Sequence, residues 1–185
     1  MKTPFGKRER ILGGSAAHFS MSARLFTKLS LVAVAGEDFP LRHIDFLRGK
    51  GIDLTSLAIN RGKTFHWQGE YRKDLNNAIT LKTELGVLAD FSPQITNEQR
   101  KIKYVFLANV DPDIQTSLLK LMHSPRLVAL DSMNYWINTK RKSLLSLLKK
   151  VDIYVANDQE ALSLSQESGI LKAAKSLHKI GAKMV

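Results

Sequence analysis

The amino-acid sequence predicts an α/β domain in which helices cover a mainly parallel sheet. Along most of the chain, short continuous apolar runs alternate with segments whose apolar residues recur at helical spacing. Continuous apolar runs are typical of strands that are buried on both faces, as in parallel sheets. With 185 residues, of which 44% are hydrophobic, the chain is long enough to bury a core of its own.

The first elements follow this alternation. Gly13 and Gly14 precede a predicted helix whose apolar residues share one face and whose N-cap is Ser15. Residues 29–35 form a continuous apolar run, which predicts a buried strand. A second helix is predicted from residue 41 to the glycines at 49 and 51.

Residues 57–90 follow a different pattern and predict an insertion. The segment 64–71 alternates, with Phe65, Trp67 and Tyr71 on one face, and residues 79–87 alternate again after the turn-rich Asp74–Asn77. This pattern predicts an antiparallel strand pair with one wet face. We expect a lid or an interface here, because closure over a ligand, packing on the main domain and pairing with a second subunit all suit an aromatic face.

The helix and strand alternation resumes after Ser92-Pro93. Strands are predicted at residues 104–108, 127–130 and 153–156. Helices are predicted to begin at Asp111-Pro112, to include residues 144–148, and to cover residues 170–177 with an end at Gly181. Met184-Val185 are predicted to begin one more strand, so we expect a single domain over residues 1–185 that is incomplete at both ends.

Composition excludes several classes of protein. The sequence contains no cysteine, which excludes a disulfide framework, a thiolate zinc site and a catalytic thiol. No apolar run approaches the roughly 20 residues that a membrane helix needs. The polar N-terminus lacks the pattern of a signal peptide, so we expect a cytoplasmic protein without membrane partners.

The net charge of +11, from 28 Lys and Arg against 17 Asp and Glu, favours anionic partners. The basic residues are scattered along the chain, however. Their densest group, Lys140–Lys142 with Lys149 and Lys150, flanks a leucine-rich segment and is typical of the solvated face of a helix. Charge alone therefore does not predict a nucleic-acid-binding protein.

Five segments in order resemble the PfkB/ribokinase-type carbohydrate kinase family. They are Gly13–His18, Leu31–Phe39, Gly51–Asp53, Asp131–Asn134 with Trp136, and Val151–Ala161. Each segment is unspecific alone, but their order and spacing extend the resemblance over residues 3–185. The resemblance implies a three-layer α/β/α sandwich with a small β lid, over residues 57–90 of this chain.

The resemblance also implies an activity. Members of this family transfer the γ-phosphoryl group of ATP, with Mg²⁺, to a hydroxymethyl group of a sugar or nucleoside. It implies that Gly13 and Gly14 let the backbone approach the sugar closely. His18 stands where the family usually has an asparagine that binds sugar hydroxyls, which leaves the identity of the sugar open. Asn109 and Asn134 are the other expected substrate-binding residues, since each follows a predicted strand.

Asn157 and Glu160 match the family's Asn-x-x-Glu motif. The resemblance implies that these side chains place magnesium-bound water and nucleotide phosphate, without a direct protein ligand to the metal. Hard oxygen atoms suit Mg²⁺, and residues three apart on a helix face the same way. The alternative is a helix cap, with asparagine as N-cap and glutamate in the first turn.

The family's catalytic Gly-Ala-Gly-Asp segment is absent from this sequence. No residue in the chain is therefore predicted to be the catalytic base, which we expect beyond residue 185. The first strand, which usually carries a sugar-binding aspartate, is also expected to be missing. We expect the chain alone to be inactive, and a non-catalytic module that binds an anionic ligand or a partner is the alternative function. A basic nucleic-acid-binding protein is a third and weaker alternative.

Overall fold

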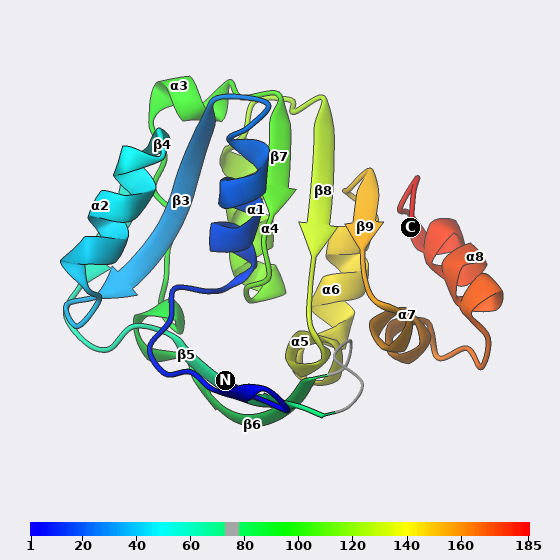
Figure 1. Cartoon of the computed structure of the whole chain (residues 1–185). Helices are drawn as coiled ribbons and strands as arrows, with labels where there is room; N and C mark the ends of the chain where they lie inside the picture. The colour runs from blue at the N-terminus through cyan, green and yellow to red at the C-terminus, as the bar shows by residue number, and fades with distance from the viewer. Residues whose placement is uncertain (73–77) are drawn as a thin grey trace. The chain divides into compact units, whose positions relative to one another are not determined.

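The computed structural model describes residues 1–72 and 78–185. The chain forms two compact units, Met1–Phe91 and Ser92–Val185, and each is described by itself (Figure 1). The turn predicted at Asp74–Asn77 lies outside the described residues. No helix in the described ranges is both long and apolar enough to cross a lipid bilayer.

The first unit contains a parallel strand pair and a separate four-stranded sheet. The pair is β3 (Leu29–Gly36) with β4 (Ile52–Asn60), which α1 (Ser15–Ala23) and α2 (Leu41–Gly49) contact. The second sheet has the order β2-β1-β5-β6. Its strands are β1 (Lys2–Thr3), β2 (Gly6–Lys7), β5 (His66–Tyr71) and β6 (Ala78–Glu84), and the short helix η1 (Gly86–Leu88) follows.

The first unit differs from the sequence prediction in several places. Strands β1, β2 and β4 were not predicted. Ser15 is the first helical residue and not the cap, because Gly14 takes the N-cap position with φ of 90° and no side-chain bond. Strand β6 ends at Glu84, since the chain turns into η1 at Gly86, which has φ of 52°. Strand β3 is half-buried over most of its length and becomes fully buried only at Ala35 and Gly36.

The predicted antiparallel pair of the insertion is confirmed as β5 and β6. The indole of Trp67 lies over Gly69, where an added Cβ would fall 2.0 Å from the ring. The same indole donates a hydrogen bond to Thr80 Oγ1 at 3.1 Å and meets Tyr71 edge-on, with ring centroids 6.4 Å apart. The aromatic face of the insertion is therefore an ordered cluster.

A polar cluster joins the start of this insertion to the end of β3. The backbone N–H and the hydroxyl of Thr64 both donate to Asp38 Oδ1 at 2.7 Å, and Gly36 N–H donates to the Thr64 hydroxyl at 2.9 Å. The chain returning from the insertion is also bound here, because Val87 N–H donates to the Lys63 carbonyl at 2.9 Å. The hydrogen bonds to Asp38, led by that of the Thr64 hydroxyl, hold the pKa of this carboxyl below its usual value.

The second unit is a parallel sheet of order β7-β8-β9 with helices packed on it. Its strands are β7 (Tyr104–Leu107), β8 (Leu127–Asp131) and β9 (Ile153–Val155). Its helices are α3 (Asn97–Arg100), α4 (Pro112–Leu121), α5 (Asn134–Thr139), α6 (Arg141–Leu148), α7 (Asp158–Ser165) and α8 (Ile170–Ile180). The predicted strands are present, and so are the helix that begins at Asp111-Pro112 and the helix that ends at Gly181. Helices α3 and α5 were not predicted.

The core of the second unit lies between these strands and helices. It consists of fully buried side chains from β7, β8, β9, α6, α7 and α8, among them Leu107, Leu130, Tyr154, Leu147, Leu164 and Leu177. Beyond β9, Met184 pairs with Ile153 in a parallel bridge, as expected of a further strand. Burial of these apolar faces fixes the sheet and its carboxyl ends.

Candidate functional site

The three parallel strands of the second unit end side by side. The last residue of β8, Asp131, and the residues that follow the three strands form what we call the carboxyl edge, which comprises residues 108–111, 131–134 and 156–160. Four of the predicted site residues lie on it. Asn109 is half-buried after β7, Asn134 is the exposed first residue of α5, and Asn157 and Glu160 begin α7. In open α/β sheets, ligands bind outside the carboxyl ends of the strands, so this is the expected place for a site.

Asn157 and Glu160 form a capping box at the start of α7. Asn157 Oδ1 accepts a hydrogen bond from Glu160 N–H at 2.9 Å, and Glu160 Oε2 accepts one from Asn157 N–H at 3.0 Å. Burial raises the pKa of Glu160, and the negative charge of Asp131 adds to this effect, while the bond from Asn157 N–H opposes it. The helix cap predicted for these residues is present.

A buried pair of hydroxyl groups links the ends of β8 and β9. Ser132 Oγ and the Tyr154 hydroxyl are 2.8 Å apart, and both residues are buried. Burial raises the pKa of Tyr154 far above its usual value, against the opposing effect of the Ser132 bond. The Tyr154 hydroxyl therefore stays protonated and acts as a neutral hydrogen-bonding group.

Gln115 of α4 is a second buried polar residue behind the carboxyl edge, with 1% of its surface exposed. Its Nε2 donates to the carbonyl oxygens of Ala108 at 2.8 Å, Asp131 at 3.1 Å and Leu107 at 3.3 Å. Sequence reasoning missed this residue, because helical periodicity shows only that Gln115 adjoins the apolar face of its helix.

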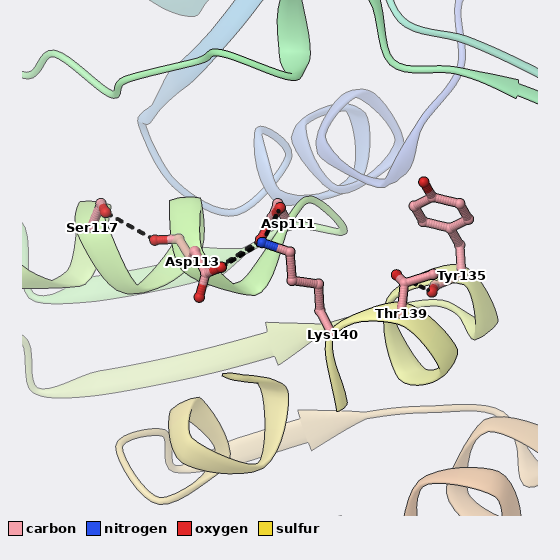
Figure 2. A network of polar contacts seen from close by, with 6 residues as sticks. All are labelled: Asp111, Asp113, Ser117, Tyr135, Thr139 and Lys140. Atoms are coloured by element: carbon pink, nitrogen blue, oxygen red, sulfur yellow. Dashed lines mark hydrogen bonds and ion pairs between the residues drawn. The ribbon is translucent and has the colours of Figure 1, made fainter. Parts of the chain in front are cut away.

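An ion network holds the N-terminus of α4, as Figure 2 shows. Asp111 caps the helix by accepting a hydrogen bond from Asp113 N–H at 2.9 Å. Lys140, between α5 and α6, reaches Asp111 Oδ2 at 3.1 Å and Asp113 Oδ2 at 2.5 Å. Hydrogen bonding by Lys140 lowers the pKa of Asp113, and the same contacts raise the pKa of Lys140. The sequence interpretation took Lys140 as part of a solvated face and missed this bridge.

Gly13, Gly14 and His18 belong to the first unit. Gly14 needs its glycine for conformation, because its φ of 90° disfavours other residues while nothing lies within 4 Å of an added Cβ. His18 is exposed on α1 and borders an open depression of about 350 Å³. The other lining residues are Leu12, Ala17, Met21, His43 and Phe46. The structure therefore groups His18 with the glycine turn, and it groups the remaining candidates at the carboxyl edge.

Comparison with known proteins gives a consistent result. No protein-family model matches the chain. A cytidine kinase from Thermococcus kodakarensis is 31% identical over 186 residues, which cover 98% of this chain and 66% of that kinase. The chain belongs to the PfkB/ribokinase-type carbohydrate kinase family.

Solved structures of this family share the fold. The nucleoside kinase of Methanocaldococcus jannaschii has a TM-score of 0.67 at 20% identity, over 89% of this chain and 56% of its own. A putative ribokinase from E. coli has a TM-score of 0.73 at 16% identity, over 92% of this chain and 60% of its own. The ribokinase of Giardia lamblia also has a TM-score of 0.73, at 14% identity over 93% of this chain and 57% of its own. The predicted ribokinase-like α/β fold is confirmed.

This PfkB/ribokinase-type chain spans 66% of the length of its curated relative. In the ranges 1–72 and 78–185, no group of three His, Asp or Glu is placed to hold a metal ion. Asp131 and Glu160 both lie at the carboxyl edge, and the charge of Asp131 contributes to raising the pKa of Glu160.

Proposed function

We propose that this chain provides the substrate-binding and phosphate-facing parts of an ATP-dependent kinase that acts on a hydroxymethyl group of a nucleoside or sugar. The observation that carries the proposal is the 31% identity to a cytidine kinase over 98% of the chain. A ribokinase-like structure from E. coli, 15% identical and with a TM-score of 0.68, is described in complex with ATP and Mg²⁺, which supports the choice of nucleotide and metal.

The residues at the start of α7 fit a magnesium ion held through water. Asn157 and Glu160 offer hard oxygen atoms, and each keeps acceptor capacity beyond its single bond in the capping box. The negative charge of Asp131 beside Glu160 further favours a cation. The ion, when bound, would neutralise charge on the phosphates during phosphoryl transfer.

The remaining roles belong to the chain's own groups. In the second unit, Asn109 and Asn134 would exchange hydrogen bonds with hydroxyl groups of the acceptor. In the first unit, Gly13, Gly14 and His18 are the residues proposed to bind sugar. Within the predicted insertion 57–90, strands β5 and β6 would act as the lid that excludes water, with Trp67 and Tyr71 on its aromatic face, whereas residues 57–60 belong to β4 and pair with β3. Positioning and exclusion of water are most of what a phosphoryl-transfer site requires of a protein.

A non-catalytic binding module is the second candidate. One observation favours it: the sequence contains no Gly-Ala-Gly-Asp segment. Such a module would still bind a nucleoside or phosphate at the carboxyl edge, but no group in the chain would take the proton of the acceptor hydroxyl.

Two assays on the purified 185-residue chain test the proposal. Titration of ¹⁵N-labelled chain with cytidine, adenosine, ribose and ATP-Mg²⁺, followed by ¹H–¹⁵N NMR, should show binding of at least one acceptor through shift changes at Asn109 and Asn134. Incubation with ATP-Mg²⁺ and the same acceptors should give no phosphorylated product, whereas a chain extended to include a Gly-Ala-Gly-Asp segment should turn over. Robust turnover by the 185-residue chain would overturn the view that its base lies elsewhere, and binding confined to nucleic acid would overturn the kinase proposal.

A further inference from the structure

The backbone pairing of β7 with β8 stops before the carboxyl edge begins. The last paired residues are Leu107 and Leu130. The next residues along the two strands are Ala108 and Asp131, and their carbonyl oxygens both accept a hydrogen bond from Gln115 Nε2, at 2.8 Å and 3.1 Å. A carboxamide nitrogen carries two hydrogen atoms, so Gln115 Nε2 can donate one to the end of each strand in these two shortest bonds. The third acceptor, the Leu107 carbonyl, is more distant at 3.3 Å.

The position of the Gln115 side chain is itself fixed. Gln115 N–H donates to the Asp111 carbonyl at 3.0 Å, within the first turn of α4. Asp111 caps that helix and is bound by Lys140 at 3.1 Å. The carboxamide therefore extends from a helix start that is held in place to the ends of two strands. If one strand end moved away from the other, one of these hydrogen bonds would break.

Gln115 is not an efficient filler of the core. Its Oε1 atom is buried and has no hydrogen-bond partner among the residues that the structure describes. Burying an unpaired acceptor is unfavourable, and a methionine would fill a similar space without such an atom. The two N–H donors of Gln115 therefore explain the presence of a glutamine at this buried position.

We propose that Gln115 is a positioning residue, which fixes the carboxyl ends of β7 and β8 relative to each other and so sets the separation of the segments that carry Asn109 and Asn134. Asn109 follows Ala108 directly, and Asn134 begins α5 three residues after Asp131. The effect on substrate rests on the proposed function, whereas the fixing of the strand ends rests on the contacts of Gln115 alone.

Two variants and one control separate this role from general stabilisation. Gln115→Met removes both donors but keeps the length of the side chain. Gln115→Glu keeps the shape and places a carboxylate against two carbonyl oxygens at neutral pH, but it regains one donor when protonated. Gln99→Met is the control, because Gln99 is also buried, with 5% of its surface exposed, and its side chain bonds Thr96 N–H at 2.8 Å in the capping box of α3.

The measurements are backbone amide exchange by NMR on the full chain and the dissociation constant for cytidine. In Gln115→Met we expect exchange at residues 108–111 and 131–134 to rise about 10-fold with core amides unchanged, and cytidine binding to weaken about 10-fold, as the loss of one or two hydrogen bonds predicts. Gln99→Met should leave both unchanged. In Gln115→Glu, protection at the same residues should recover on acidification, which serves as the test if Gln115→Met does not fold.

The results that contradict the inference are distinct from those that contradict the proposed function. Unchanged exchange at the carboxyl edge in Gln115→Met, or a uniform rise that Gln99→Met reproduces, overturns the positioning role. If amide exchange rises only at the carboxyl edge in Gln115→Met, and the wild-type chain binds no acceptor, the positioning role is supported and the proposed function is contradicted.

Discussion

Asn157 and Glu160 each bind the other's backbone: Asn157 Oδ1 accepts from Glu160 N–H at 2.9 Å, and Glu160 Oε2 accepts from Asn157 N–H at 3.0 Å. The carboxyl group of Glu160 in this reciprocal cap has a raised pKa. Burial is the main cause, and the negative charge of Asp131 adds to it. Folding therefore disfavours the charged form of Glu160 relative to the unfolded chain, although the cap can be formed by either form.

Glu160→Gln should consequently stabilise the chain at neutral pH. Because the pKa is raised in the folded state, Glu160 contributes its full stability below the usual value of 4.5, and this contribution is lost as the pH rises through the raised value. We expect Tm at pH 7 to increase by about 1–3 °C in the variant, and the difference from wild type to vanish near pH 4. Calorimetry at both pH values measures this, and a lower Tm for the variant at pH 7 would show that the charge stabilises the cap.

The same substitution tests the phosphate and metal role in a chain extended to catalytic competence. If Glu160 orients magnesium-bound water, Glu160→Gln should lower kcat by about 10- to 100-fold, and additional Mg²⁺ should partly restore it. Asn157→Asp is the companion variant, since aspartate caps a helix as well as asparagine but adds charge near the phosphates. Normal kinetics and normal magnesium dependence in both variants would leave these residues as a helix cap only.

Lys140→Met should weaken the start of α4. The lysine lies between two carboxylates, Asp111 and Asp113, which would repel each other without it. Since the side chain of Lys140 is 39% exposed, we expect a loss of only about 0.5–1 kcal/mol, smaller at high salt. Chemical denaturation at two salt concentrations measures the loss, and carboxyl ¹³C titration should show the pKa of Asp113 rising towards its usual value. Lys142→Met, next along α6, is the matched control and should change neither quantity.

Thr64→Val should loosen the start of the insertion at residues 57–90. The variant keeps the shape of the side chain but removes the hydroxyl that donates to Asp38 and accepts from Gly36 N–H. The pKa of Asp38 is lowered in the folded chain, so its contribution to stability is present above the usual value of 3.8 and is lost as the pH falls through the lowered value. The wild type should therefore exceed the variant in amide protection of β5 at neutral pH but not in strong acid. Equal protection at neutral pH would show that the backbone bonds suffice.

Gly69→Ala should displace the indole of Trp67. An added Cβ would lie 2.0 Å from the ring, so the ring must move and give up its 3.1 Å bond to Thr80. We expect a red-shifted Trp67 emission and a loss of about 1–3 kcal/mol in the stability of the β5–β6 sheet, as for other overpacked sites. Trp136→Phe removes the second tryptophan from the signal, and Thr80→Val, which removes only the bond, shows how much of the change the bond explains.

The sequence was sufficient for most of the longer elements and for the caps at Asp111 and Asn157, since these depend on residues close together in the chain. It did not predict β4, which forms half of the parallel pair of the first unit. Asp111-Pro112 begins α4, Gly181 ends α8, and the Asn157–Glu160 cap forms as the spacing indicates. The polar residues behind the carboxyl edge could not be found in this way. Gln115 reaches Asp131 and Lys140 reaches Asp113 across 16 and 27 positions of sequence, and neither side chain interrupts the apolar pattern of its segment.

Backbone conformation explains the remaining differences. Serine is a residue type favoured at N-caps, but Gly14 takes the N-cap position with a positive φ, so Ser15 becomes the first residue of α1. Helix α5 is short and begins without a side-chain cap, so neither periodicity nor capping residues marked it. The roles of Gly13, His18, Asn109 and Asn134 depend on ligand contacts, which neither hydrophobic pattern nor fold determines.

Because Tyr154 is buried against Ser132, the ultraviolet absorbance of Tyr154 can show whether the second unit is folded. Tyr154 resists ionisation in the folded chain because burial raises its pKa, so its phenolate absorbance should appear only when the core opens. Stability from this residue is present below the usual pKa of 10 and is lost as the pH rises further, so alkali should unfold the unit and ionise Tyr154 in one step. A near-ultraviolet titration with base would then report the opening of the second unit through the ionisation of Tyr154.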